Sequence, residues 1–447
     1  MSEFINLSLE DTMSIPLLID IVPFDNRYLV ISPETAKWFV LDCAHDVELF
    51  KELRGKTIQH LFDYYPNSVD DILDIIYRIK QMRFDTVNTI SCTTEGKKHL
   101  HFYLTNKCNL SCPHCYMYSG ESSKEELSTE EVITVLENFM KSGGEKVTFS
   151  GGEVSTRSDF LTLVKKAKEA GLSVRVLTNG VRWSKEQINS ISPLIDSIQI
   201  SIDGFDEISN SAIRGKGNFE KALHTVDSFH SLGNNVEIAI TPFYNESLKD
   251  KIDLFAEFIK KLLHKYNNGH FKINIAKEII KGRNVDLTKE QLSEYKMLME
   301  QLHHKIYGEN TTMLNFFKSF SGDVVMDNCM YGIYSVSANG NVYMCSRVSE
   351  LTPIGNVKTM SFEEIALASK KAEALSNINN LSPCKSCNLK YICGGGCRIE
   401  FFPTLTSSAN IFDLSSDEIA PRKCNKKEKE FYYELMMQCA DYMCSKK

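Results

Sequence analysis

Three cysteines with the spacing CxxxCxxC, Cys108, Cys112 and Cys115, follow an apolar run at residues 101–106. Three thiolates at this spacing suit three irons of a cubane iron–sulfur cluster, which normally takes four cysteine ligands. One iron then remains open to a substrate, so the spacing predicts catalysis. The alternative is a structural zinc site, but zinc prefers four closed ligands, and no fourth ligand lies nearby in the sequence.

A second group of seven cysteines lies toward the C-terminus, with the pattern CxxC-x5-C-x3-C at its centre. These spacings are poor for a pair of zinc knuckles, so iron–sulfur ligation is favoured over zinc. Asn339-Gly340 is a strong two-residue turn and predicts a hairpin between the first two cysteines of the group. The seven cysteines are Cys329, Cys345, Cys384, Cys387, Cys393, Cys397 and Cys424.

The overall composition restricts the class of protein. The formal net charge is −7, whereas nucleic-acid-binding proteins usually carry a basic face. The N-terminus lacks a basic segment followed by a long apolar core, which argues against a secretory signal, and no apolar run is long enough for a membrane span. We therefore expect a cytoplasmic protein with neither a nucleic-acid nor a membrane partner.

In a reducing compartment, fourteen cysteines indicate metal or redox sites rather than disulfides. Four of the fourteen lie outside the two groups: Cys43, Cys92, Cys439 and Cys444. Buried free thiols are common, so these four are predicted to pack in the core.

Residues 96–285 are expected to alternate between strands and helices. Repeated βα units form a parallel sheet, so the predicted architecture is a partial (βα)6 barrel. Ser128 and Glu131 form a capping box for a helix at residues 129–141. The CxxxCxxC loop leaves the first strand, at the carboxyl end where such folds collect their ligands. The predicted strands are Phe102–Leu104, Val147–Phe149, Val174–Leu177, Ile198–Ile202, Val236–Ile240 and Phe271–Ile275.

Short polar motifs follow three of these strands. They are Ser150-Gly151-Gly152-Glu153, Thr178-Asn179-Gly180 and Ser201-Ile202-Asp203-Gly204, with Arg214-Gly215 further on. Each is weak alone, because Gly-Gly is more often a turn and Ser-x-Asp-Gly more often a loop cap. Glycines let the backbone approach a ligand closely, and the planar guanidinium of arginine suits a carboxylate. With the cysteine loop, these motifs predict one ligand site at the strand ends.

Together these motifs resemble those of the radical S-adenosylmethionine (radical SAM) superfamily. The resemblance implies that the open iron binds the amino and carboxylate groups of SAM, that Ser201 and Asp203 bind its ribose, and that Arg214 binds its carboxylate. His114 takes the place of an aromatic residue that packs on adenine. Asn210 departs from the family, which often has histidine there. The implied SAM-binding residues are Gly151, Gly152, Glu153, Asn179, Ser201, Asp203, Arg214 and His114.

The C-terminal cysteine pattern resembles the SPASM extension of radical SAM enzymes. This resemblance implies two auxiliary 4Fe–4S clusters, which with the SAM-binding cluster make three. Their ligands would be Cys329, Cys345 and Cys397 for the first, and Cys384, Cys387, Cys393 and Cys424 for the second.

The first auxiliary cluster is then one thiolate short. Relatives carry an extra cysteine a few residues before the position of Cys329, where this chain has Asp323 or Asp327. Either a carboxylate completes the cluster, or one iron stays open to a substrate thiolate, which the metal would deprotonate.

Residues 1–95 are expected to form a separate domain of short strands followed by helices that begin after Thr57 and Ser68. The order resembles the winged-helix domain that captures leader peptides in maturases of ribosomally made peptides. Such domains add the peptide as an extra strand. A structural cap or an oligomerisation domain is the alternative. Residues 286–325 are predicted to form a helical bridge, and residues 326–447 a SPASM domain that ends in a helix.

The resemblance as a whole implies a radical SAM peptide maturase of the sactisynthase, ranthipeptide-synthase or cyclic-peptide cross-linking type. Cleavage of SAM would give a 5'-deoxyadenosyl radical that takes hydrogen from a carbon of the peptide. The expected product is an intramolecular thioether in a ribosomally synthesised peptide that is recruited by its leader. An external donor such as flavodoxin or ferredoxin would supply electrons.

Three other functions stay open. A carbon–carbon cross-link is a close competitor of the thioether. Formylglycine formation in sulfatases is disfavoured, because Ser346 stands where those enzymes usually have an acid/base aspartate. A non-catalytic iron–sulfur scaffold that binds peptides is the third.

Overall fold

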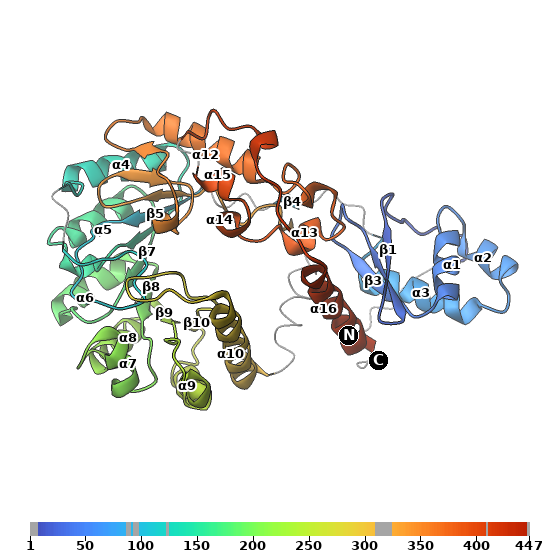
Figure 1. Ribbon diagram of the computed structural model, residues 1–447, viewed down its shortest axis with the longest axis horizontal. Helices are drawn as coiled ribbons and strands as arrows, with labels where there is room; N and C mark the ends of the chain where they lie inside the picture. Colours follow the sequence, from blue (N-terminus) through green and yellow to red (C-terminus); the bar gives the residue numbers. More distant parts are fainter. Residues whose placement is uncertain are drawn as a thin grey trace.

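The computed structural model describes residues 8–85, 91–92, 98–121, 125–308, 324–407 and 410–444. Figure 1 shows an α/β barrel at one end of the molecule and a small unit from the N-terminal region at the other, with the C-terminal region between them. Within the described residues, no helix is both long enough and apolar enough to cross a membrane.

Six parallel strands form the barrel and confirm the strands predicted from the sequence. Each pairs with the next in chain order, and β5 also pairs with β12, so one sheet has the order β10-β9-β8-β7-β6-β5-β12-β13-β14. Its two ends do not meet, which makes the barrel partial, as predicted. The barrel strands are β5 (His99–Tyr103), β6 (Lys146–Ser150), β7 (Ser173–Thr178), β8 (Ser197–Ser201), β9 (Asn235–Ile240) and β10 (Phe271–Ile275).

Helices that follow these strands cover the outer face of the sheet (Figure 1). In the first of them, Ser128 Oγ accepts from the backbone N–H of Glu131 at 3.2 Å, and the Glu131 carboxylate accepts from the N–H of Ser128 at 2.8 Å. The predicted capping box is therefore confirmed. The helices are α4 (Thr129–Lys141), α5 (Phe160–Glu169), α6 (Lys185–Ile191), α7 (Glu207–Arg214), α8 (Phe219–Ser231), α9 (Leu248–Lys265) and α10 (Lys289–Tyr307).

The C-terminal region continues the barrel sheet. The predicted hairpin is present as β12 (Tyr334–Val336) and β13 (Asn341–Tyr343), with Gly340 at φ +88°, a conformation that favours glycine. Because β12 pairs with both β5 and β13, Cys345, two residues after β13, is held close to the first barrel strand. The other elements of this region are β11 (Val324–Val325), β14 (Gly355–Asn356), α12 (Phe362–Ser376), α13 (Lys390–Cys393), α14 (Arg398–Phe401), α15 (Pro403–Ser407) and α16 (Lys426–Cys444).

The N-terminal unit is a three-stranded antiparallel sheet with three helices. Its strands precede its helices, and two helices begin after Thr57 and Ser68, as predicted, whereas the sequence did not predict α1. The elements are β1 (Asp20–Phe24), β2 (Arg27–Ile31), β3 (Trp38–Leu41), α1 (Ala44–Glu52), α2 (Ile58–Tyr64) and α3 (Val69–Gln81). A further strand, β4 (Ser91–Cys92), pairs with β11.

Both faces of this small sheet are buried. Residues including Val30 and Phe39 pack against α1–α3. Residues of the other face, including Trp38 and Val40, pack against Met436 and its neighbours on α16. The N-terminal unit is therefore fixed to the last helix of the chain through an apolar contact.

Two of the cysteines predicted to lie in the core can be placed. Cys439 is 1% exposed and joins the contact with the N-terminal sheet, as predicted. Cys43 is exposed before α1, so that prediction was wrong: its strand ends at Leu41 and the chain has already turned to the surface. The side chains of Cys92 and Cys444 lie outside the described residues, as does Asp323.

Candidate active site

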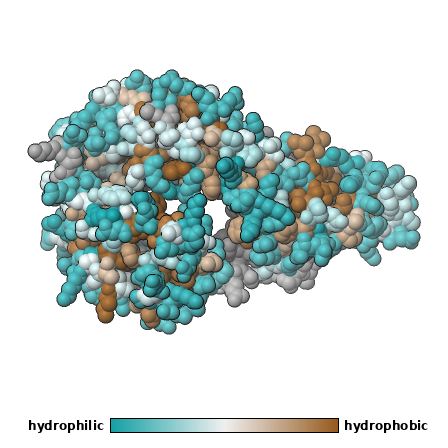
Figure 2. Space-filling model, viewed as in Figure 1, coloured by the Kyte–Doolittle hydropathy of each residue, from teal (hydrophilic) through white to brown (hydrophobic). Residues whose placement is uncertain are grey.

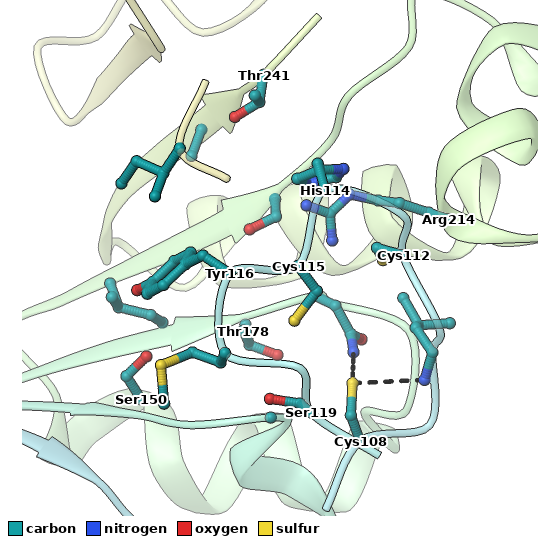
Figure 3. Close-up of a pocket in the computed structure, with 18 of the residues that line it drawn as sticks. Cys108, Cys112, His114, Cys115, Tyr116, Ser119, Ser150, Thr178, Arg214 and Thr241 are labelled. Carbon is teal, nitrogen blue, oxygen red and sulfur yellow. Dashed lines mark hydrogen bonds between the residues drawn. The ribbon is translucent and has the colours of Figure 1, made fainter. Parts of the chain in front are cut away.

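A cavity of about 350 Å³ lies at the carboxyl ends of the barrel strands. Cys108, Cys112 and Cys115 all line it, together with residues from the ends of β6 to β10 (Figure 3). Figure 2 shows the molecule hollowed between the barrel and the C-terminal region, with hydrophobic residues around the opening. The structure thus brings the three predicted cysteines to the predicted edge of the sheet.

The surroundings of the three thiols suit an iron–sulfur cluster. The sulfur of Cys108 accepts from the backbone N–H of Leu110 at 3.4 Å and from Asn179 Nδ2 at 3.9 Å, and such donors stabilise cluster thiolates. Burial raises the pKa of Cys108 to about 11, so a metal must displace the proton. Within the described residues, no three His, Cys, Asp or Glu side chains converge as the ligands of a single ion do. In a cubane cluster each thiolate binds a different iron, so its ligands need not converge on one point.

The two glycines of the Gly151-Gly152-Glu153 motif pack against the backbone that leads into the cysteine loop. A Cβ on Gly151, which has φ +141°, would lie 2.4 Å from the carbonyl oxygen of Thr105. A Cβ on Gly152 would lie 2.4 Å from that of Lys107. The close approach predicted for these glycines is thus made to the loop itself, and both also line the cavity.

Glu153 is buried behind the cavity. One carboxylate oxygen accepts from the Thr178 hydroxyl and the other from the backbone N–H of Asn179, both at 2.7 Å. The carboxylate therefore holds the end of β7, and from there Asn179 reaches the cysteine loop through a 2.9 Å bond to Asn109. Gly151 and Gly152 line the cavity, whereas Glu153 does not.

Asp203 is 1% exposed and holds Arg214 in place. Its carboxylate accepts from Arg214 Nε at 2.6 Å and from the backbone N–H of Thr241 at 2.9 Å. Burial opposes the charge on Arg214, but Asp203 and the thiols of Cys112 and Cys108 together raise the pKa of Arg214, so the guanidinium stays charged beside the thiols. Arg214 and Ser201 line the cavity.

His114 and Asn210 complete this corner. His114 lies beside Arg214 (Figure 3), with Nε2 3.3 Å from the Asp203 carboxylate. Burial lowers the pKa of His114, so the ring is neutral at physiological pH. Asn210, where relatives often have histidine, accepts from the backbone N–H of Asp203 at 3.1 Å. The asparagine therefore supports Asp203 from behind.

Comparison with known proteins agrees with this geometry. Residues 102–258 match the Radical SAM superfamily, and residues 328–388 match SPASM, an iron-sulfur cluster-binding domain. The chain therefore carries a radical SAM domain followed by a SPASM domain.

Several proteins are similar to this radical SAM enzyme. Sporulation killing factor maturation protein SkfB of Bacillus subtilis is 29% identical over 288 residues, which cover 63% of this chain and 65% of SkfB, just under two thirds of that protein. PqqA peptide cyclase of Bradyrhizobium diazoefficiens is 26% identical over 69% of this chain and 83% of its own length. The solved structure of anSMEcpe with bound AdoMet shares the fold with a TM-score of 0.56, at 16% identity over 77% of this chain and 93% of the other.

A turn after β10 clamps the cysteine loop of the radical SAM domain. The backbone N–H of Asn284 donates to the oxygen of Pro113 at 2.7 Å, and that of Arg283 to the oxygen of Cys115 at 3.2 Å. The Arg283 guanidinium also donates to the backbone oxygen of Ser119. The sequence did not predict this clamp. Gly282, whose Cβ would meet the backbone of His114 at 2.6 Å, was the only local signal of a close approach.

Tyr103 connects the radical SAM site to the SPASM domain. Its hydroxyl lies 3.2 Å from that of Tyr116, next to Cys115, and donates to the backbone oxygen of Ser346, next to Cys345. The first and second groups of cysteines are therefore joined through one side chain at the end of β5.

The seven SPASM cysteines fall into two neighbourhoods. The thiol of Cys345 interacts electrostatically with Cys329 and Cys397. Cys384 interacts in the same way with Cys387 and Cys393, and Cys424 with Cys387. Each neighbourhood corresponds to one of the ligand sets that the resemblance implied, and the residues fit two clusters.

Asp327 is buried near the first set, with 6% exposure. One carboxylate oxygen accepts from Asn377 Nδ2 at 2.7 Å. The other is buried, and within the part of the chain that the structure describes it has no hydrogen-bond partner. This oxygen fits the alternative in which a carboxylate completes the first auxiliary cluster.

The glycine packing predicts which substitution disrupts the first cluster. In Gly152→Ala the methyl group would collide with the carbonyl oxygens of Lys107 and Asn106, so the loop must move. We expect reconstituted protein to lose about one cluster, roughly four irons per chain. Gly120→Ala is the matched control, because a Cβ there meets nothing within 4 Å in the same loop. Equal iron and sulfide contents in the two variants would contradict this account.

Proposed function

We propose that this enzyme is a maturase that forms an intramolecular thioether in a ribosomally synthesised precursor peptide. The connection of the two cysteine sites through Tyr103 carries the proposal, because a peptide in the cavity can then present a carbon at one site and a thiol at the other. Two relatives are named a maturation protein and a peptide cyclase, which supports a peptide substrate.

Residues of the cavity would bind and orient SAM. Cys108, Cys112 and Cys115 would hold the cluster, and charged Arg214 would pair with the carboxylate of SAM. We assign Asp203 to orienting Arg214, because its carboxylate is already bound by Arg214 and Thr241. With the cluster and SAM bound, the site supplies a 5'-deoxyadenosyl radical that abstracts hydrogen from carbon.

The SPASM cysteines would complete the oxidation. The reaction first removes one hydrogen atom from a carbon of the peptide and leaves a carbon radical. Bond formation between this radical and the thiol then releases one proton and one electron. The hydrogen atom goes to the 5'-deoxyadenosyl radical, which becomes 5'-deoxyadenosine, and the thiol proton goes to solvent. Cys329, Cys345 and Cys397 would hold a cluster that receives the electron released when the carbon–sulfur bond forms. An external donor such as flavodoxin or ferredoxin would reduce the cluster at the SAM-binding site.

Mass spectrometry of a cysteine-containing candidate peptide tests the reaction. After anaerobic incubation with SAM and reductant, we expect the peptide to lose two hydrogens, with one cysteine blocked to alkylation and one 5'-deoxyadenosine formed per product. The same mass loss with all cysteines free would replace the thioether by a carbon–carbon bond. Absence of 5'-deoxyadenosine would favour the non-catalytic scaffold, and Cys112→Ala is the inactive control.

We further propose that the first auxiliary cluster keeps an iron open for the substrate thiolate. In a triple variant without Cys108, Cys112 and Cys115, a peptide with cysteine should change the electron paramagnetic resonance (EPR) signal of this cluster, and the same peptide with serine should not. Asp327→Asn should leave the response intact, because the amide preserves the packing. A signal that changes in Asp327→Asn but never with peptide would show that Asp327 is the fourth ligand.

The leader is proposed to pair with the outer edge of β3. Ser32 N donates to the oxygen of Lys37, and this hydrogen-bonded pair sets the alternation along β2 and β3, so Val40 turns its backbone groups outward. On the opposite edge of the sheet, Pro23 is an outward-facing residue of β1, and proline has no N–H to donate. The Val40 oxygen accepts from Arg78 at 2.9 Å, which agrees with this outward direction. The Val40 N–H is then the group that the leader would engage.

Hydrogen–deuterium exchange on the full-length enzyme distinguishes the two edges. We expect leader peptide to slow backbone exchange in residues 38–41 of β3 and to leave residues 20–24 of β1 unchanged, because pairing engages outward N–H groups. A core peptide without leader is the control. Protection of β1, or none within residues 8–85, would exclude this mode of capture.

A further inference from the structure

Arg398 is a fully buried cation in the SPASM domain. It is 0% exposed and opens α14 directly after Cys397. Its guanidinium donates to backbone oxygens only: Nε to Ser376 at 2.9 Å, Nη1 to Gly394 at 2.9 Å and to Gly396 at 2.6 Å. Nη2 completes the set with a 3.5 Å contact to the backbone oxygen of Asp327.

Within the described residues, no carboxylate pairs with Arg398. The two other arginines near the SPASM cysteines differ in this respect. Arg347 contacts Cys397 Sγ at 3.5 Å and binds Glu350 and Glu400. Arg422 contacts Cys393 Sγ at 3.8 Å and binds Glu428. The charge of Arg398 is therefore the uncompensated one of the three.

The acidic groups that interact electrostatically with Arg398 are thiols of both ligand sets, which become anionic when they bind iron. They are Cys329 and Cys397 from the first set and Cys384 and Cys393 from the second. A buried charge is costly unless it is paired. Clusters held by thiolates are anionic and become more so on reduction, so two clusters here would pair with Arg398 from both sides.

The glycine run between Cys393 and Cys397 is shaped for this guanidinium. Gly394, Gly395 and Gly396 have φ of +65°, +75° and +70°, and a Cβ on Gly395 would lie 3.1 Å from Arg398 Nη1. Two of their oxygens bind Arg398, and that of Gly395 accepts from Arg422. The absence of side chains in this run therefore leaves room for the guanidinium of Arg398.

We propose that Arg398 is the counter-charge shared by the two auxiliary clusters and that it raises the reduction potential of both. A positive charge stabilises the reduced, more negative state of each cluster more than its oxidised state. The inference rests on the two clusters of the proposed function. Arg398 acts as a positioning and tuning residue and touches no substrate.

Anaerobic redox titration followed by EPR tests this in the full chain without Cys108, Cys112 and Cys115, so that only auxiliary signals are present. We expect Arg398→Gln to shift both auxiliary potentials to more negative values. The double variant Arg422→Gln with Glu428→Gln removes a compensated pair and should shift them less. A shift confined to one cluster, or a larger shift in the control, would overturn the proposal.

Arg398→Lys keeps the charge but loses most of the hydrogen bonds, and we expect it to keep the parent potentials. If Arg398→Gln does not fold, Arg398→Lys provides the test by itself. A shift of its auxiliary potentials to more negative values would show that hydrogen bonds, and not the charge, set the potentials, and would overturn the proposal. The titration contains neither SAM nor peptide, so a failed peptide-modification assay leaves it unaffected. Absence of both auxiliary signals in the parent would contradict the inference together with its cluster assignment.

Discussion

Backbone contacts fix the shape of the cysteine loop, and the SAM site depends on them. The loop is largely irregular, so it has no hydrogen-bond ladder of its own to fix the three thiols. Gly151 and Gly152 support it from β6, and Arg283 and Asn284 hold it from beyond β10. Because these contacts are made by main-chain atoms, they fix the loop without side chains that would fill the cavity.

The sheet extends this order into the SPASM domain. Pairing of β12 with β5 puts Cys345 and the first barrel strand into one rigid element, and Tyr103 spans the remaining gap. A substrate that reaches from one cysteine site to the other therefore meets a fixed separation. Such preorganisation is what a reaction between a carbon radical and a distant thiol requires.

Local patterns predicted much of this structure. The six barrel strands, the capping box at Ser128 and the turn at Gly340 follow from short-range periodicity and turn chemistry, and the cavity-lining cysteines from their spacing. The sequence could not reveal contacts between distant segments. The Arg283 clamp comes from a turn without periodicity, and α1 begins after Cys43, an unusual residue at a helix start.

Roles within the site were also hard to predict from motifs alone. Glu153 and Asp203 stand in the expected motifs, yet their carboxylates bind Thr178 and Arg214, and only the neighbouring residues face the cavity. Arg398 donates to backbone oxygens of Asp327, Ser376 and Gly394, and no carboxylate pairs with it among the described residues. No spacing in the sequence encodes this meeting of distant segments.

The last helix has a consequence for how the enzyme assembles. α16 begins two residues after Cys424, and its middle brings Met436 into the apolar contact with the N-terminal sheet. With Cys424 as a ligand, this helix would join a metal centre to the N-terminal unit, the leader-binding unit of the proposed function. Insertion of iron would then fix the start of the helix on which the N-terminal sheet packs, so cluster assembly would contribute to the placement of that unit.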